Sequence, residues 1–210
     1  MSIGLLGRKL GMTRVFDPQG VAVPVTVVEA GPCWVIQRKT VENDGYDAVQ
    51  LGFVEKKKGV NKPQAGHSRK RDVPSARFVR EIRVERDAGL DPGDVLTVSL
   101  FKEGERVDVT GVSKGRGFQG VVKRHGFRGG RSTRGSMFHR APGSIGASAD
   151  PSRVLKNARM PGRMGAERVT RRNLLVIKVD SERNILLVKG DVPGHSGGHV
   201  IVKKSAKGGK

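Results

Sequence analysis

A long basic, glycine-rich stretch without a single acidic residue sets the main limit on how this chain can fold. Residues 111–146 read GVSKGRGFQGVVKRHGFRGGRSTRGSMFHRAPGSIG, with Lys or Arg every few positions. Glycines lose much backbone entropy on ordering and like charges repel one another, so this stretch gains little by folding alone. We therefore expect an external ligand to supply the missing negative charge.

The charge of the whole chain is concentrated around this stretch. The 210 residues carry a formal charge of +20, and residues 111–172 account for +13 of it, since Asp150 and Glu167 are their only acids. The length suits one ordinary domain with an appendage. A basic stretch attached to a more ordinary domain is typical of a nucleic-acid binder. The alternative, a merely solvated basic surface, is disfavoured because such surfaces usually interleave acids.

Cysteine use and hydropathy indicate a soluble intracellular protein. Cys33 is the only cysteine, so neither an intrachain disulfide nor a Cys-cluster zinc site is possible. The N-terminus, MSIGLLGRKLGMTRVF, lacks the long apolar region of a signal peptide, and no apolar run approaches the roughly 18 residues of a membrane span. We expect a cytoplasmic protein that is not exported and has no membrane partner.

Outside the basic stretch, short and often β-branched apolar runs predict strands. They cover 21–30, 33–39, 46–53, 94–101, 174–180 and 184–190, while 76–84 fits either a strand or a helical turn. DPQG at 17–20 predicts a type I turn, NDG at 43–45 a hairpin-type turn, and SERN a link between the last two runs. Many short strands with tight turns predict a mostly β, antiparallel barrel or sandwich, and disfavour a doubly wound α/β fold.

Two basic segments interrupt the strands. Residues 54–75, with two prolines, fit a surface loop or short helix inserted between strands. The larger segment, 125–166, is interpreted as a long irregular excursion from a single barrel, because strands of one core flank it. A structureless loop of this length would argue against the assignment unless a ligand orders it.

The spacing of Gly115, Gly117 and Gly120 matches G-x-G-x-x-G, yet it does not predict a dinucleotide site. That fingerprint needs a buried parallel strand before it, a helix after it and an acid about 20 residues further on. The next acid is Asp150. We expect these glycines to let the backbone approach phosphates, with Lys114 and Arg116 alongside.

The histidines and aromatic residues favour RNA over a metal. His195 and His199 lack enough partners for a metal site, so a surface turn is the favoured interpretation. His125, Phe127, Phe138 and His139 alternate with arginines, a mixture that stacks on unpaired bases, although local packing is the alternative.

No catalytic constellation is recognisable in the sequence. No nucleophile–base–orienter set or paired carboxylates in an apolar setting occur, so we expect no enzyme, catalytic residue, metal, cofactor or small-molecule substrate. An irregular Gly-rich arm suits a folded RNA better than a DNA duplex, and no DNA-recognition motif is present.

In its motifs, the sequence resembles the bacterial members of the universal large-subunit ribosomal protein three family. The most specific stretch is FKEGERVDVTGVSKGRGFQGVVKR, with supporting runs along nearly the whole chain: IGLLGRKLGMTRVF, NDGYDAVQLG, KPQAGH, HRAPGSIG, RMPGRMGAERVT and NILLVKGDVPG. The matching signature residues are Phe101, Asp108, Gly111, Ser113, Gly115, Arg116, Gly117, Gly120 and Arg124. In one departure, Ala147, Ser148 and Ala149 stand where many relatives carry glutamine, which excludes a glutamine modification there.

The resemblance implies a six-stranded, translation-factor-like β-barrel whose extension threads the 23S ribosomal RNA towards the peptidyl transferase centre. It also implies an early role in assembly of the 50S subunit, neighbouring ribosomal proteins as partners, and no homo-oligomer. We assign 1–124 and 167–205 to the barrel, 125–166 to the extension, and 206–210 to a flexible tail. The runner-up function is a free-standing nucleic-acid chaperone or chromatin-type binder.

Two sets of residues are predicted to form the site. The RNA-binding residues are Lys114, Arg116, Lys123, Arg124, His125, Arg128, Arg131, Arg134, His139, Arg140, Arg153, Lys156, Arg159, Arg163 and Arg168. The tip of the extension, expected near the peptidyl transferase centre, comprises Gly143, Ser144, Ile145, Gly146, Ala147, Ser148, Ala149 and Asp150.

Overall fold

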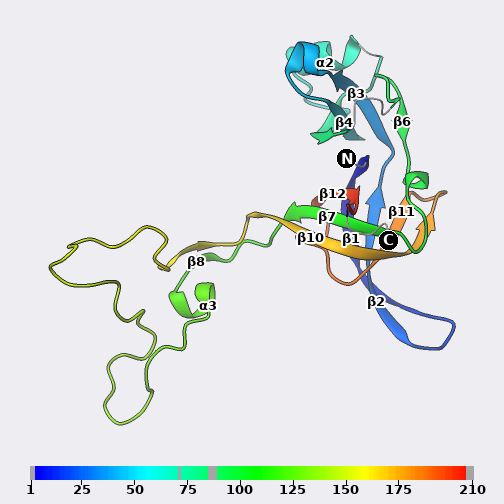
Figure 1. Cartoon of the computed structure of the whole chain (residues 1–210). Helices are drawn as coiled ribbons and strands as arrows, with labels where there is room; N and C mark the ends of the chain where they lie inside the picture. The colour runs from blue at the N-terminus through cyan, green and yellow to red at the C-terminus, as the bar shows by residue number, and fades with distance from the viewer. Residues whose placement is uncertain (1–2, 71, 85–88, 207–210) are drawn as a thin grey trace. The chain divides into compact units, whose positions relative to one another are not determined.

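The computed structural model describes residues 3–70, 72–84 and 89–206, and its chain divides into two compact units (Figure 1). The first unit is Met1–Ser113 with Arg168–Lys210, and the second is Lys114–Glu167. The second unit thus includes residues 114–124, which the sequence analysis assigned to the barrel. Of the tail predicted at 206–210, residues 207–210 lie outside the described part.

Six antiparallel strands of the first unit close into a ring in the order β1-β12-β7-β10-β11-β2. Hydrophobic alternation sets the strand faces: in β7 the side chains of Val107 and Val109 are buried, while Asp108 and Thr110 point outward. The strands are β1 (Gly4–Phe16), β2 (Ala22–Ala30), β7 (Arg106–Val112), β10 (Arg168–Asp180), β11 (Ile185–Lys189) and β12 (His199–Lys204).

Strand β1 contains glycines because neighbouring backbones approach it closely. A Cβ on Gly4 would lie 2.4 Å from the Val202 carbonyl oxygen, and one on Gly7 would lie 2.5 Å from that of Glu29. The Lys9 side chain on the same strand is buried, and its Nζ donates to the Val192 carbonyl at 2.8 Å. Side chains larger than hydrogen at these two glycines would force the ring apart.

A second antiparallel sheet, in the order β5-β4-β3-β6, belongs to the same unit and shares its core. Val35, Leu51 and Phe53 of this sheet belong to the same buried cluster as Leu5 and Leu186 of the ring. One continuous core therefore supports both sheets. The elements are β3 (Cys33–Lys39), α1 (Val41–Asp44), β4 (Ala48–Glu55), α2 (Lys62–Arg69), β5 (Ala76–Arg83), β6 (Val95–Leu96) and the 3-10 helix Val98–Leu100.

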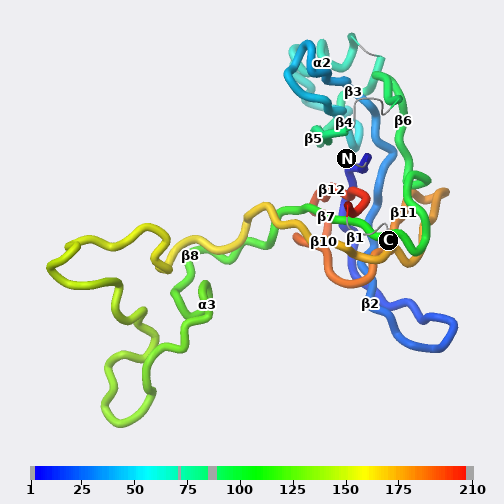
Figure 2. Tube along the Cα trace, viewed as in Figure 1, coloured from blue at the N-terminus to red at the C-terminus, as the bar shows by residue number. Residues whose placement is uncertain are grey.

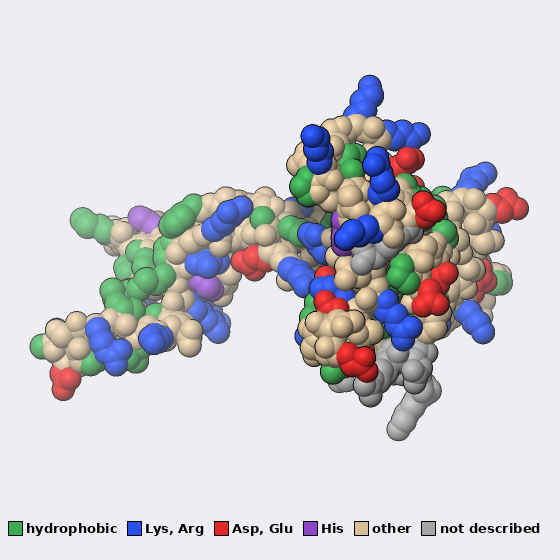
Figure 3. Space-filling view, turned by 90° about the horizontal axis from the view of Figure 1, so that it is seen from above, with side chains coloured by type: hydrophobic (Ala, Val, Ile, Leu, Met, Phe, Trp, Pro, Cys, Tyr) green, Lys and Arg blue, Asp and Glu red, His purple; other side chains and the backbone are tan. Residues whose placement is uncertain are grey.

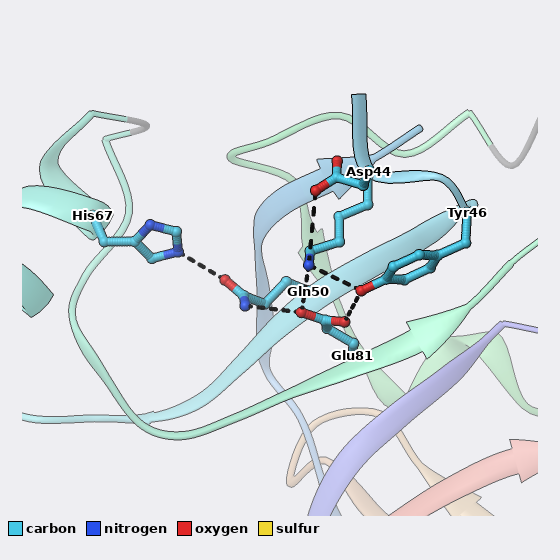
Figure 4. Close-up of polar contacts among 6 residues, drawn as sticks. Asp44, Tyr46, Gln50, His67 and Glu81 are labelled. Carbon is cyan, nitrogen blue, oxygen red and sulfur yellow. Dashed lines mark hydrogen bonds and ion pairs between the residues drawn. The ribbon is translucent and has the colours of Figure 1, made fainter. Parts of the chain in front are cut away.

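A polar network ties helix α2 and the α1 turn to the second sheet (Figure 4). His67 Nε2 on α2 lies 2.8 Å from Gln50 Oε1, and the Gln50 amide donates to Glu81 at 3.4 Å. The Tyr46 hydroxyl donates to Glu81 at 2.8 Å, and Lys39 Nζ lies 3.1 Å from the same carboxylate. Glu81 is thus the shared acceptor, and these bonds hold its pKa below the usual range, that from Tyr46 contributing most.

The second unit has little regular structure (Figure 2). Its elements are β8 (Gly117–Gln119), α3 (Val121–His125) and β9 (Gly162–Met164). β8 and β9 pair antiparallel, which brings the two ends of the excursion together. Residues 126–161 between α3 and β9 form neither helix nor strand.

Most of the strand predictions are confirmed. The run 94–101 is not one strand, because only Val95–Leu96 pairs with β3 before the 3-10 helix begins. NDG at 43–45 lies, as predicted, in the connection of a hairpin, that of β3 and β4; there it ends the α1 turn, with Gly45 in the left-handed conformation at φ 79°. The ambiguous run at 76–84 is strand β5, while β1, β7, β8, β9 and β12 were not predicted. Among the described helices, none is long and apolar enough to cross a membrane.

Candidate nucleic-acid interface

The base of the second unit is a short two-stranded neck. Gly117 pairs with Met164 and Gln119 with Gly162, and the Arg116 amide donates to the Met164 carbonyl at 2.9 Å. Gly165 lies at φ +76°, and a Cβ there would approach the Lys114 carbonyl oxygen to 2.1 Å. The neck therefore requires glycine at Gly165, and it positions Lys114 and Arg116 on its rim.

Arg124 and His125 at the end of α3 close the neck from within the unit. Arg124 Nη1 donates to the Met160 carbonyl at 2.8 Å, and His125 Nε2 lies 3.0 Å from the same oxygen. A Cβ on Gly162 would meet the Arg124 guanidinium at 2.4 Å, so glycine leaves room for this clamp. Both residues were predicted to bind RNA, and here they also hold the returning limb of the excursion.

A second closure shapes the loop after α3. The Gly130 amide donates to the His139 carbonyl at 2.8 Å, and the Phe138 ring packs so closely on Gly130 that a Cβ would lie 2.6 Å from it. The His125 and Phe127 ring centroids are 6.1 Å apart. Local packing, the alternative weighed for these rings in the sequence, thus occurs at Phe138 and between His125 and Phe127.

The predicted tip is a fully exposed turn of small residues. Every residue from 143 to 150 is exposed, and the Ser144 hydroxyl donates to the Gly146 carbonyl at 3.1 Å. Gly143 and Gly146 adopt φ +88° and +159°. The turn thus presents backbone, small side chains and the exposed Ile145, with Asp150 as its single charge.

Cationic side chains are scattered over the second unit among apolar and other residues (Figure 3), and almost nothing in this unit is buried. In residues 114–167, all of them described, Val121 alone is buried. The cationic side chains, all exposed except the half-buried Arg124, are Lys114, Arg116, Lys123, Arg124, Arg128, Arg131, Arg134, Arg140, Arg153, Lys156, Arg159 and Arg163. Arg168, the last predicted cation, instead lies in the first unit, where β10 begins and pairs with Val112.

A set of exposed apolar side chains lies among these cations, and of these only Ile145, in the tip, was predicted from the sequence as a site residue. Met137 is 98% exposed and Phe118 is 77% exposed, and Ile145, Val154 and Leu155 are also exposed. Large apolar side chains without a core to enter indicate surfaces that a partner covers. The sequence could have indicated these exposed side chains, because they lie in a segment with too few apolar residues to form a core that would bury them.

The described residues offer no metal centre. They contain no group of three or more His, Cys, Asp or Glu side chains placed to hold an ion. The His199 ring stacks on Phe78 with centroids 4.4 Å apart, and burial together with Arg77 and Arg8 lowers its pKa. The Gly198 amide donates to the His195 carbonyl at 3.1 Å, which forms a turn between the two histidines.

A mostly β protein that carries a cationic, coreless excursion is the class that this fold and surface define. Comparison with known proteins gives the family. Residues 84–185 match the family model described as ribosomal protein L3. Proteins called large ribosomal subunit protein uL3 are similar along the full length. The one from Solibacter usitatus is 56% identical over 210 residues, which cover 99% of this chain and 100% of that protein.

Two further relatives agree. The uL3 of Carboxydothermus hydrogenoformans is 54% identical over 209 residues, with 99% of this chain and 100% of that protein covered. The uL3 of Geobacillus thermodenitrificans is 55% identical over 208 residues, with 99% and 98% covered. The chain therefore belongs to the ribosomal protein L3 (uL3) family, and the resemblance inferred from the motifs is confirmed.

Proposed function

We propose that this protein is a structural constituent of the large ribosomal subunit that binds 23S ribosomal RNA directly. The observation that carries the proposal is the second unit, Lys114–Glu167, in which nearly every cation is exposed and Val121 alone is buried. Such a segment cannot be stabilised by a core, whereas phosphate neutralisation with release of counterions supplies a large favourable free energy. The relatives are named for the large ribosomal subunit, which supports the same conclusion.

The residues divide into two kinds of contact. The exposed cations neutralise phosphates, while the exposed rings and apolar side chains, such as Phe118 and Met137, pack against unpaired bases. The predicted RNA-binding residues all remain part of the proposal, Arg124 and His125 with the added task of closing the neck. Function resides in binding and crevice filling, without chemistry by the protein.

As part of this proposal, we carry over the finer assignments from the family resemblance. The closed ring is a barrel of the kind found in translation factors, and it forms the globular domain from which the extension leaves. The tip, residues 143–150, reaches towards the peptidyl transferase centre; its small exposed residues suit a turn among closely packed nucleotides. Early binding during 50S assembly, neighbouring ribosomal proteins and a place in the cytoplasmic ribosome complete the proposal.

Sedimentation tests this function against the runner-up. A tagged chain expressed in bacteria should migrate with large subunits through sucrose gradients at high salt, in constant proportion to ribosomal RNA. A free-standing nucleic-acid chaperone or chromatin-type binder would be stripped from the particles by the salt, because its binding is electrostatic and has no fixed site. Recovery of the chain only at the top of the high-salt gradient would refute the proposal.

A further inference from the structure

A cavity of about 440 Å³ opens on the first unit, and none of its lining residues is among the RNA-binding residues predicted from the sequence. Strands β7, β10 and β12 of the ring supply most of its wall, and Arg83 at the end of β5 and Ser205 and Ala206 after β12 supply the rest. The charged and hydroxyl-bearing side chains of this wall decide what it can hold.

The strand register places these side chains on the outer face of the ring. Thr110 pairs with Thr170 on one side, and Asp108 pairs with Lys203 on the other. Because Val109 of β7 is buried in the core, its neighbours Asp108 and Thr110 point away from the core and into the cavity. Most of the cavity wall is thus built on paired strands.

A β-bulge in β10 aims two more side chains into the cavity. The pairing with β7 shifts between Arg171 and Leu174, and Asn173 adopts φ +62°. The backbone N–H of Asn173 donates to Asp108 Oδ1 at 2.7 Å, and this hydrogen bond stabilises the unfavourable backbone conformation of Asn173. Bulges commonly redirect side chains at functional positions, and here Arg172 and Asn173 both line the wall.

The cavity carries an excess of positive charge. Arg83, Arg172, Lys203 and Lys204 face the single carboxylate of Asp108. Lys204 is partly compensated, since its Nζ lies 2.9 Å from the Glu105 carboxylate outside the wall. Partial burial lowers the pKa of Lys203, and the nearby Arg168 lowers it further. The cationic form of Lys203 is therefore poorly solvated here, and a bound anion would stabilise it.

Hydrogen-bond donors accompany the charges. The Thr110 and Thr170 hydroxyls lie 2.9 Å apart and bond to each other, which uses only one of the pair's two hydroxyl hydrogens. The other hydrogen and the Asn173 side-chain amide can both donate to a ligand oxygen. Cations with neutral donors around them form the usual environment of a bound phosphate.

The geometry points to a binding site for one ribose-phosphate unit of an RNA backbone, with the phosphate at Arg172 and Lys203 and the ribose 2′-hydroxyl at Asp108. The carboxylate selects this ligand. Asp108 would repel a free phosphate, whereas its remaining lone pairs accept a hydrogen bond from the 2′-hydroxyl that RNA has and DNA lacks. The inference rests on the proposed function and adds a second RNA contact, on the ring itself.

Binding of the full chain to 23S ribosomal RNA over a range of salt concentrations tests the site. The double variant Arg172→Gln/Lys203→Gln should make the slope of log affinity against log salt less negative by about 0.7, because it removes the contact with one phosphate. The matched control Lys178→Gln/Lys189→Gln removes the same charge from exposed positions outside the cavity, and its slope should stay that of the parent chain.

The variant Asp108→Asn tests the ribose contact. The asparagine keeps a side-chain oxygen that can accept the hydrogen bond from the Asn173 backbone N–H. The ratio of the affinity for RNA to the affinity for DNA of the same sequence should fall severalfold, because binding of DNA gains most from the loss of the carboxylate. An unchanged slope in the double variant, or an unchanged ratio in Asp108→Asn, overturns the site, provided that thermal melting shows both variants folded. Cross-links from Lys203 to protein alone in purified subunits would also overturn it.

These experiments distinguish a failure of the proposed function from a failure of the cavity assignment. If the parent chain does not bind 23S ribosomal RNA, the proposed function fails. If the parent chain and the control bind normally and the cavity variants match them, the cavity assignment alone fails.

Discussion

Replacing three exposed arginines of the second unit by glutamine should change how strongly salt weakens RNA binding. Arg128, Arg131 and Arg134 are all exposed; Arg131 and Arg134 lie in the loop that the Gly130–His139 hydrogen bond closes, and Arg128 lies just before it. Glutamine keeps a polar side chain of similar length and removes only the charge. The loop itself should therefore persist in the triple variant.

The expected size follows from counterion release. If about eight cations of the parent chain contact phosphate, its affinity should fall by roughly three decades between 50 and 200 mM monovalent salt. Loss of three contacts makes the slope less negative by about 2, so the fall over the same range should be about 20-fold smaller. Fluorescence anisotropy with labelled 23S ribosomal RNA at several salt concentrations measures both slopes.

A matched control separates local contacts from net charge. The triple variant Arg14→Gln/Lys178→Gln/Arg183→Gln removes the same charge from exposed positions of the first unit. Its slope should remain close to that of the parent chain. Equal slopes in the two triple variants would refute the reasoning, since binding would then depend on total charge and not on the extension.

Four further outcomes are expected. Burial raises the pKa of Cys33 to about 12, so thiol reagents should label it only as fast as the chain unfolds, measured with Ellman's reagent with and without urea. Leu186→Ala should lower the free energy of unfolding by about 2–5 kcal/mol in urea titrations, because Leu186 is fully buried in the core. Since the pKa of Glu81 is lowered in the folded state, its stabilisation should be complete above the ordinary value of 4.5 and be lost as pH falls below it, an acid sensitivity that Glu81→Gln should reduce in melting curves. Gly146→Arg and Ala149→Asp at the tip should leave incorporation into large subunits near normal while altering peptidyl transfer or drug sensitivity, because displacements of about 1 Å impair catalysis; unchanged activity in assembled particles would contradict the placement of the tip.

The sequence predicts the parts of the fold that follow simple periodicity. Runs such as 33–39 and 184–190 are apolar, β-branched and bounded by turn residues, and each forms a strand. Strand β1 escaped prediction because Gly4 and Gly7 are required by close backbone contacts, and because the buried charge of Lys9 is satisfied by a carbonyl far along the chain. Such long-range contacts leave no local pattern.

In the candidate interface, too, the sequence predicts the local features and not those that depend on long-range contacts. Composition alone identifies the cationic excursion, because charge and glycine content are local properties. The clamp of Arg124 on the Met160 carbonyl and the cavity beside Lys203 depend on residues far apart in the chain. Pairing of strands β8 and β9, and of β7 with β12, creates both features, and only the structure reveals it.

Cross-linking from the extension inside purified large subunits tests the central claim most directly. Met137 is 98% exposed and suits replacement by a photoreactive phenylalanine analogue without loss of a core contact. Irradiation of subunits that carry this variant should join residue 137 to 23S ribosomal RNA, in a single region identified by primer extension. Cross-links to proteins alone, or scattered RNA cross-links without a preferred region, would contradict the account.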